Sequence, residues 1–102
     1  MGAHEVGERA SVTPERPLCV AVGGRSIAIF DVGGDCLAID DECTHAGGPL
    51  SEGEVEGGVV TCPWHGARFD LSTGAVLSGP AGSAVKSYPL RIEGSAIRIE
   101  VD

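Results

Sequence analysis

Residues 43–70 read CTHAGGPLSEGEVEGGVVTCPWHGARFD and hold two of the chain's four cysteines and two of its three histidines. Cys43 and His45 form a CxH pair, and Cys62 and His65 form a CxxH pair after sixteen intervening residues. Each pair can bind from one loop, and a hairpin over residues 51–61 can bring the two loops face to face. Four thiol and imidazole ligands at these separations indicate a metal site.

Three kinds of metal site are compatible with this ligand set. Two thiolates and two imidazoles can form a closed tetrahedral zinc site, although zinc fingers usually begin with two cysteines and end with two histidines. A copper site with two histidines and one cysteine would leave one thiolate unused. One Cys and one His in each loop fit an iron-sulfur cluster with two unlike irons, and the spacing favours this option.

The rest of the chain predicts a small all-β fold. Its 102 residues match one domain, 42% of them are apolar and only 4% aromatic. Short segments with alternating or β-branched residues are separated by glycine turns at 23–24, 33–34, 57–58 and 94–95, which predicts antiparallel hairpins in a sandwich or barrel. The expected strands are PLCVAV (17–22), SIAIFDV (26–32), CLAID (36–40), GVVTC (58–62), KSYPLRIE (86–93) and SAIRIEV (95–101).

The loops rich in Gly, Pro, Ser and Thr between about 41 and 82 interrupt this pattern, so we expect a cluster-binding subdomain inserted in a single domain of residues 1–102. The first ten residues are expected to be loosely held. They carry no signal-peptide h-region, and no later segment approaches membrane-spanning length, which predicts a soluble, cytoplasmic protein. Thiols stay reduced there, so the cysteines are interpreted as ligands and core residues rather than disulfides.

Fifteen acidic residues against seven basic ones give a net charge of −8. This charge argues against nucleic acid and anionic membranes as partners and favours a basic protein surface. Acidic residues crowd positions 40–56, and no Lys or Arg occurs between Arg25 and Arg68. This acidic run is either a solvated face or part of a docking surface beside the metal site.

The two motifs, with SGPAG at 78–82 and the ending YPLRIEGSAIRIEV, resemble the Rieske proteins, specifically the Rieske-type ferredoxins of bacterial ring-hydroxylating dioxygenase systems. The resemblance covers nearly the whole chain. It implies a Rieske-like antiparallel β sandwich and one [2Fe-2S] cluster, which a third loop at Gly79, Pro80 and Ala81 would cover. It further implies cluster binding by Cys43 and Cys62 on the inner iron and by His45 and His65 on the outer iron.

The resemblance also implies a reduction potential near the low end of the Rieske range of roughly −150 to +300 mV. High-potential relatives carry an additional disulfide where this chain has Gly48 and Trp64. They place serine and tyrosine hydroxyls, which donate toward cluster and ligand sulfur, where this chain has Ala67 and Phe69. Without these donors the added electron is less stabilised.

Several other residues receive structural interpretations. Cys19 and Cys36 lie in expected strands and are interpreted as small core residues. Asp70 is expected to cap a turn, and Gly66 to let its backbone N–H approach the cluster. His4 is expected to face solvent.

A Rieske oxygenase needs a second iron held by two histidines and a carboxylate, and once His45 and His65 are committed only His4 remains. The chain is therefore expected not to be an enzyme. We expect a monomeric electron carrier between a flavin-dependent NAD(P)H reductase and a terminal dioxygenase. Two alternatives remain open: a Rieske subunit of a larger enzyme such as a nitrite reductase, and a structural zinc module.

Overall fold

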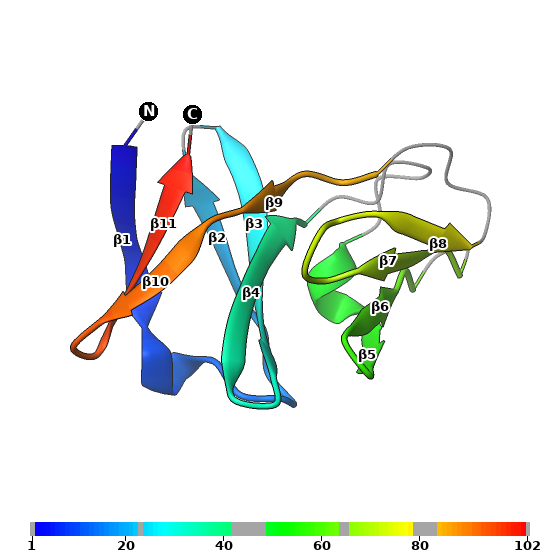
Figure 1. Cartoon of the computed structure of the whole chain (residues 1–102), viewed down its shortest axis with the longest axis horizontal. Helices are drawn as coiled ribbons and strands as arrows, with labels where there is room; N and C mark the ends of the chain where they lie inside the picture. Colours follow the sequence, from blue (N-terminus) through cyan, green and yellow to red (C-terminus); the bar gives the residue numbers. More distant parts are fainter. Residues whose placement is uncertain (1, 23, 42–48, 64–65, 79–83, 102) are drawn as a thin grey trace.

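The computed structural model describes residues 2–22, 24–41, 49–63, 66–78 and 84–101. Its strands pair antiparallel in three sheets, in the orders β1-β11-β10, β2-β3-β4-β9 and β5-β6-β7-β8. Figure 1 shows the first two sheets packed as a sandwich and the third beside them. The all-β prediction is confirmed. The strands are β1 (Gly2–Glu8), β2 (Leu18–Val22), β3 (Arg25–Val32), β4 (Asp35–Asp40), β5 (Glu54–Glu56), β6 (Val59–Thr61), β7 (Arg68–Asp70), β8 (Val76–Ser78), β9 (Ser87–Tyr88), β10 (Leu90–Glu93) and β11 (Ala96–Val101).

Glycine turns join consecutive strands where the sequence predicts them. Gly33 and Gly34 connect β3 to β4 with φ values of 61° and 94°, and Gly57 and Gly58 connect β5 to β6 with 60° and 79°. Two consecutive positive φ values define a type I′ turn, whose twist matches that of the flanking strands. The register of both hairpins is thereby fixed.

The hydrophobic interior consists of two clusters on opposite faces of β3. Ile27 and Ile29 face the sandwich core, while Ala28 and Phe30 face a second cluster, the junction core, against the third sheet. A strand covered on both faces loses the polar alternation of a half-buried strand, which explains the continuous apolar run of β3. The sandwich core contains Val12, Val22, Ile27, Ile29, Ala38, Tyr88, Ile97 and Ile99. The junction core contains Ala28, Phe30, Ile39, Leu50, Val60, Cys62, Ala67, Phe69, Leu71 and Val85.

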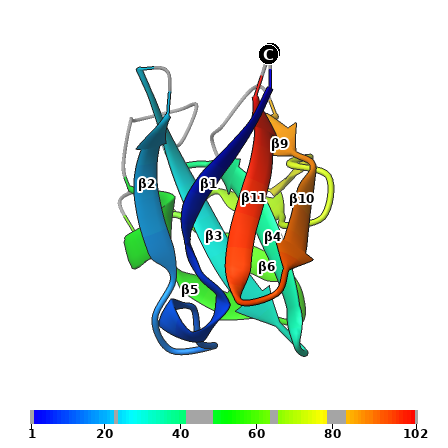
Figure 2. The ribbon, with the colours of Figure 1, turned by 90° about the vertical axis from the view of Figure 1, so that its left-hand side faces the viewer.

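Two expectations about the strands were wrong. The N-terminal residues are not loosely held: β1 pairs with β11 from Gly2↔Val101 to Glu8↔Ala96, and Figure 2 shows the two strands side by side. The segment 86–93 is two strands, because Pro89 separates β9, which pairs with β4, from β10, which pairs with β11. Proline has no N–H to contribute to a ladder, so the chain changes sheets there.

Two short 3-10 turns, η1 (Arg9–Ser11) and η2 (Leu50–Glu52), complete the described elements. Within the described ranges, no helix has the length and apolar character needed to cross a membrane.

Candidate metal centre

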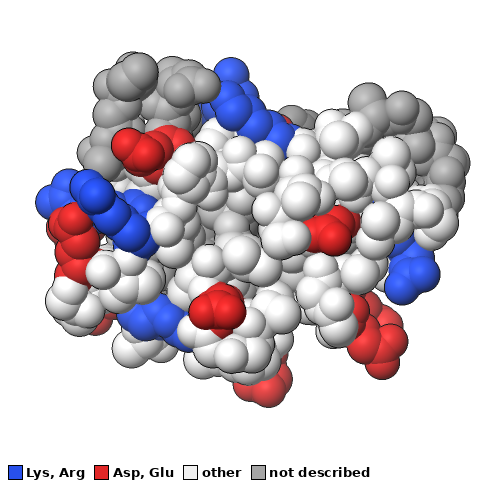
Figure 3. Space-filling view, in the orientation of Figure 1, with Lys and Arg blue, Asp and Glu red and all other residues white. Residues whose placement is uncertain are grey.

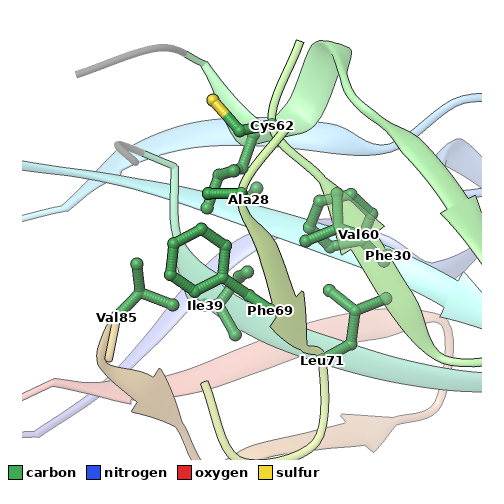
Figure 4. Close-up of a cluster of buried hydrophobic side chains, with 10 residues drawn as sticks. Ala28, Phe30, Ile39, Val60, Cys62, Phe69, Leu71 and Val85 are labelled. Atoms are coloured by element: carbon green, nitrogen blue, oxygen red, sulfur yellow. The ribbon is translucent and has the colours of Figure 1, made fainter. Parts of the chain in front are cut away.

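Cys62 is the one predicted ligand that lies among the described residues, directly after β6. Its side chain is 2% exposed, and its thiol is free of any disulfide. Figure 4 shows the sulfur at one end of the junction core, pointing away from the apolar side chains that pack there. Cys43, His45 and His65 lie outside the described residues, as do Gly48, Trp64 and the expected third loop at Gly79, Pro80 and Ala81.

A tight backbone turn holds Cys62 in place. Its N–H donates to the carbonyl of Ala67 at 2.7 Å, and its carbonyl accepts the N–H of Gly66 at 3.1 Å. Both polar backbone groups of Cys62 are thus used within the turn, which leaves the sulfur as its available ligand atom. A thiol whose backbone is fixed at one end of the junction core is suited to bind a metal-sulfur group. The sequence provides one more thiol and two imidazoles that could bind the same group.

Gly66 serves this turn rather than the role expected from the sequence. Its φ of 77° is one that side chains rarely adopt, and its N–H is bonded to Cys62. An N–H committed to a carbonyl is not free to approach a cluster. The requirement for glycine at this position is therefore conformational.

The chain that leaves the first ligand loop packs against the strand that leads to Cys62. Leu50 is fully buried in the junction core, and its carbonyl accepts the N–H of Gly53 at 2.9 Å. A Cβ on Gly53 would lie 2.1 Å from the carbonyl oxygen of Thr61, so the η2 turn approaches β6 with no room for a side chain. This contact lies one residue before Cys62 and links the two ligand-bearing regions.

Asp40 anchors the chain that follows residues 79–83. Its N–H donates to the carbonyl of Lys86 at 2.9 Å, and its carboxylate accepts the hydroxyl of Tyr88 and the N–H of Lys86. Arg25 donates to the same tyrosine oxygen at 3.3 Å. Burial, together with the hydrogen bond to Asp40, raises the pKa of Tyr88 above its usual value, so the hydroxyl stays a donor at neutral pH.

The other residues singled out in the sequence have mixed outcomes. Cys19 is exposed rather than a core residue, because its side chain leaves β2 on the face where its thiol donates to a carboxylate of Asp41. Cys36 is partly buried against the sandwich core. His4 is exposed, as expected. Asp70 caps a turn by accepting from the N–H and hydroxyl of Ser72, which lower its pKa.

Asp41 has a structural role that the sequence did not indicate. It is the one buried charged residue among those described, at 7% exposure. Its position two residues before Cys43, a predicted ligand, could have pointed to a role near the site. However, Asp41 stands between Asp40 and Glu42, and the sequence alone does not distinguish the three acidic residues.

Acidic side chains dominate the surface of the third sheet and its turns. Glu52, Glu54 and Glu56 are exposed around β5, and Arg68 is the one basic residue within 49–63 and 66–78. In Figure 3 red side chains project at the lower right, where β5 lies in Figure 1, and most of the blue ones lie over the sandwich. The charge asymmetry expected from the sequence is therefore present on the folded surface.

Comparisons with known proteins indicate the family of this chain. The profile of the Rieske [2Fe-2S] domain matches residues 2–89. The ferredoxin component of the naphthalene 1,2-dioxygenase system of Pseudomonas aeruginosa is 39% identical over 84 residues, which is 82% of this chain and 81% of that protein.

Solved structures agree as well. The ferredoxin of Sphingomonas yanoikuyae B1 has a TM-score of 0.92 at 30% identity, covering 99% of this chain and 100% of that one. A chain in the complex of reduced oxygenase and oxidized ferredoxin in carbazole 1,9a-dioxygenase has a TM-score of 0.87 at 28% identity, covering 95% of this chain and 91% of that one.

Proposed function

The chain belongs to the Rieske [2Fe-2S] domain family, and we propose that it is a soluble, cytoplasmic one-electron carrier. It takes electrons singly from a flavin-dependent NAD(P)H reductase and delivers them to a terminal ring-hydroxylating dioxygenase. The observation that carries this proposal is the match to a ferredoxin over nearly the full length of both chains, with Cys62 held on a tight turn at the mouth of the junction core.

The proposed ligands of the one [2Fe-2S] cluster are Cys43 and Cys62 for one iron and His45 and His65 for the other. When bound, the cluster accepts and returns a single electron. The turn around Cys62 supports this assignment, because it fixes the thiol while leaving the sulfur free to bind. We further propose that residues 1–102 act as one Rieske domain with its cluster-binding subdomain at about 41–82.

The chain transfers electrons and has no oxygenase chemistry of its own, like the ferredoxin components that it resembles. Beyond the proposed ligands, His4 is the one remaining histidine in the sequence. It is exposed on β1, in the sheet opposite the third one. A mononuclear iron site with two histidines cannot be assembled from it.

The exposed acids around β5 support docking to basic surfaces of both partners. Opposite charges speed the encounter of two proteins and orient them before contact. A carrier that serves a reductase and an oxygenase must present the same end to each in turn, which a monomer does most simply. A neighbouring structure that contains oxygenase together with ferredoxin provides a precedent for the second encounter.

The electron paramagnetic resonance (EPR) spectrum of the reduced protein, with iron and sulfide analysis, tests the proposal. We expect two irons and two labile sulfides per chain and a low average g value, which reports mixed nitrogen and sulfur ligation. Replacing His45 or His65 by alanine should abolish that signal, whereas His4→Ala should leave it unchanged. A colourless, sulfide-free protein loaded with zinc would overturn the proposal.

A further inference from the structure

The segment that carries Cys43 and His45 begins and ends at hydrogen bonds made by Asp41. The Asp41 carbonyl accepts the N–H of Leu50 at 2.6 Å. Its carboxylate atom Oδ1 accepts the N–H of Ser51, also at 2.6 Å. Asp41, which precedes this segment, is therefore hydrogen-bonded to Leu50 and Ser51, which follow it.

The backbone at Cys62 is held in a different way. Cys62 bonds to Ala67 and Gly66 through backbone groups alone, so no side chain is needed to hold that turn. In the first segment one of the two closing bonds depends on a side chain. Every residue has a backbone carbonyl, but few have a carboxylate of this length. The hydrogen bond to Ser51 therefore depends on the identity of residue 41, whereas the hydrogen bond from Cys62 to the carbonyl of residue 67 does not depend on the side chain there.

The carboxylate of Asp41 is itself fixed from a second strand. Its Oδ2 accepts the thiol of Cys19 on β2 at 3.1 Å, while the N–H of Asp41 donates to the carbonyl of Ser26 on β3 at 2.9 Å. At 7% exposure the group has little water around it, so its hydrogen bonds are strong and their loss is costly. The bond from Cys19 holds Oδ2 against the sandwich, which leaves Oδ1 directed at the N–H of Ser51.

We propose that Asp41 is a positioning residue for the metal centre: its carboxylate, oriented by Cys19, clamps Ser51 and sets the geometry in which the first ligand loop presents Cys43 and His45. This inference rests on the proposed cluster site. It concerns residues that would not touch the cluster themselves.

The test measures the rate at which the purified, cluster-loaded protein loses iron to a chelator, together with the EPR spectrum of the reduced form. Asp41→Ala removes the clamp, and we expect iron loss to accelerate roughly tenfold to hundredfold, as the loss of one charge-assisted hydrogen bond implies. Its g values should shift and broaden. Asp41→Asn keeps an oxygen acceptor for Ser51, and its NH2 group can donate to the Cys19 sulfur in place of the bond that Oδ2 accepts, so it should stay within about threefold of the parent.

Asp31→Ala is the matched control. Asp31 also accepts a backbone N–H, that of Gly34, and pairs with Arg9 at 3.1 Å, but it lies at the other end of the β3–β4 hairpin. We expect this variant to unfold at a lower temperature with unchanged g values and a rate of iron loss near that of the parent. Asp41→Glu keeps the charge but displaces the carboxylate, and should lose iron at least threefold faster even if Asp41→Ala does not fold.

Parent-like iron loss in Asp41→Ala or in Asp41→Glu overturns the proposal. So does an Asp41→Asn variant as impaired as Asp41→Ala, because charge rather than geometry would then be responsible. If Asp31→Ala loses iron as fast as Asp41→Ala, the faster loss would come from lower overall stability, which also overturns the proposal. These failures are distinct from failure of the proposed function, in which the parent protein itself would contain no cluster.

Discussion

Adding the two missing hydroxyls to the Cys62 hairpin should raise the reduction potential. Val60 pairs with Phe69, and Cys62 bonds to Ala67, so these four side chains lie on one face of the β6–β7 hairpin. Ala67 and Phe69 are fully buried in the same junction core as Cys62. Ala67→Ser and Phe69→Tyr would therefore add hydroxyl donors in a dry environment, on the face of the hairpin that carries Cys62.

The size of the shift follows from hydrogen-bond energies. A hydrogen bond to a charged group contributes about 1.5–3 kcal/mol. If roughly half of that appears only when the electron is added, each hydroxyl stabilises the reduced form by about 1.1 kcal/mol, which for a one-electron couple is about 50 mV. The double variant should then have a midpoint about 100 mV above the parent, whose own midpoint we expect near the low end of the Rieske range.

Protein-film voltammetry measures the midpoints, and thermal unfolding provides an independent check. A buried hydroxyl that finds no acceptor costs about 1–3 kcal/mol, and each kcal/mol lowers Tm by roughly 4–8 °C in a domain of this size. A hydroxyl that bonds to sulfur should thus raise the potential and largely preserve Tm. Phe30→Tyr, which adds the same group from β3 to the same core, should lower Tm without moving the potential.

The reasoning is refuted if Ala67→Ser and Phe69→Tyr keep the parent EPR spectrum but leave the midpoint unchanged. A rise of equal size in Phe30→Tyr would also contradict it, because the effect would then not depend on the Cys62 hairpin. A parent midpoint well above zero would contradict the starting premise.

Three further predictions address packing, docking and protonation. Gly53→Ala should lower the free energy of unfolding by about 1–3 kcal/mol in a denaturant titration, since its Cβ would lie 2.1 Å from the carbonyl oxygen of Thr61; an unchanged midpoint would contradict this close approach. Electron transfer from the reductase should slow as salt is added, and a rate indifferent to ionic strength would rule out docking through the acids around β5. Partial desolvation of the thiol on its Asp41 side, with the hydrogen bond to Asp41, raises the pKa of Cys19 from 9.0 to about 11. Near pH 8 its alkylation should therefore be roughly a hundredfold slower than that of an ordinary thiol, as mass spectrometry can follow. The pKa of Cys19 is higher in the folded protein than in the unfolded chain. The stability that this difference contributes to the folded state is therefore complete below pH 9.0 and should be lost as the pH rises toward about 11.

Local patterns in the sequence were sufficient for much of the fold. The alternation in 18–22 and 96–101 and the paired glycines at 33–34 and 57–58 predict strands and turns, because these features depend on neighbouring residues only. The strand β1 could not be found in this way. Its sequence GAHEVGE has two glycines and little apolar alternation, and it becomes a strand because β11, far along the chain, supplies its hydrogen bonds.

The site shows the same division between local and distant information. The proposed ligands come from the spacing of the CxH and CxxH pairs, which is readable without a structure. The environment of Cys19 cannot be read from the sequence, because a thiol is apolar enough to suggest a core position. Only the folded sheet, which brings Asp41 at the end of β4 within reach of Cys19 although β3 separates β4 from β2, shows that this thiol is a hydrogen-bond donor to Asp41.

Two consecutive carboxylates at the end of β4 connect the surroundings of the metal centre to the sandwich. Asp40 bonds to Lys86 and Tyr88, on the chain that follows residues 79–83. Asp41 bonds to Ser51, on the chain that follows residues 42–48. The resemblance places Gly48 and Trp64 where high-potential relatives carry a bracing disulfide, and neither side chain can form one. We expect the hydrogen bonds at this strand end to brace the site instead, so thiol reductants, which would open a disulfide, should leave the geometry of the site unchanged.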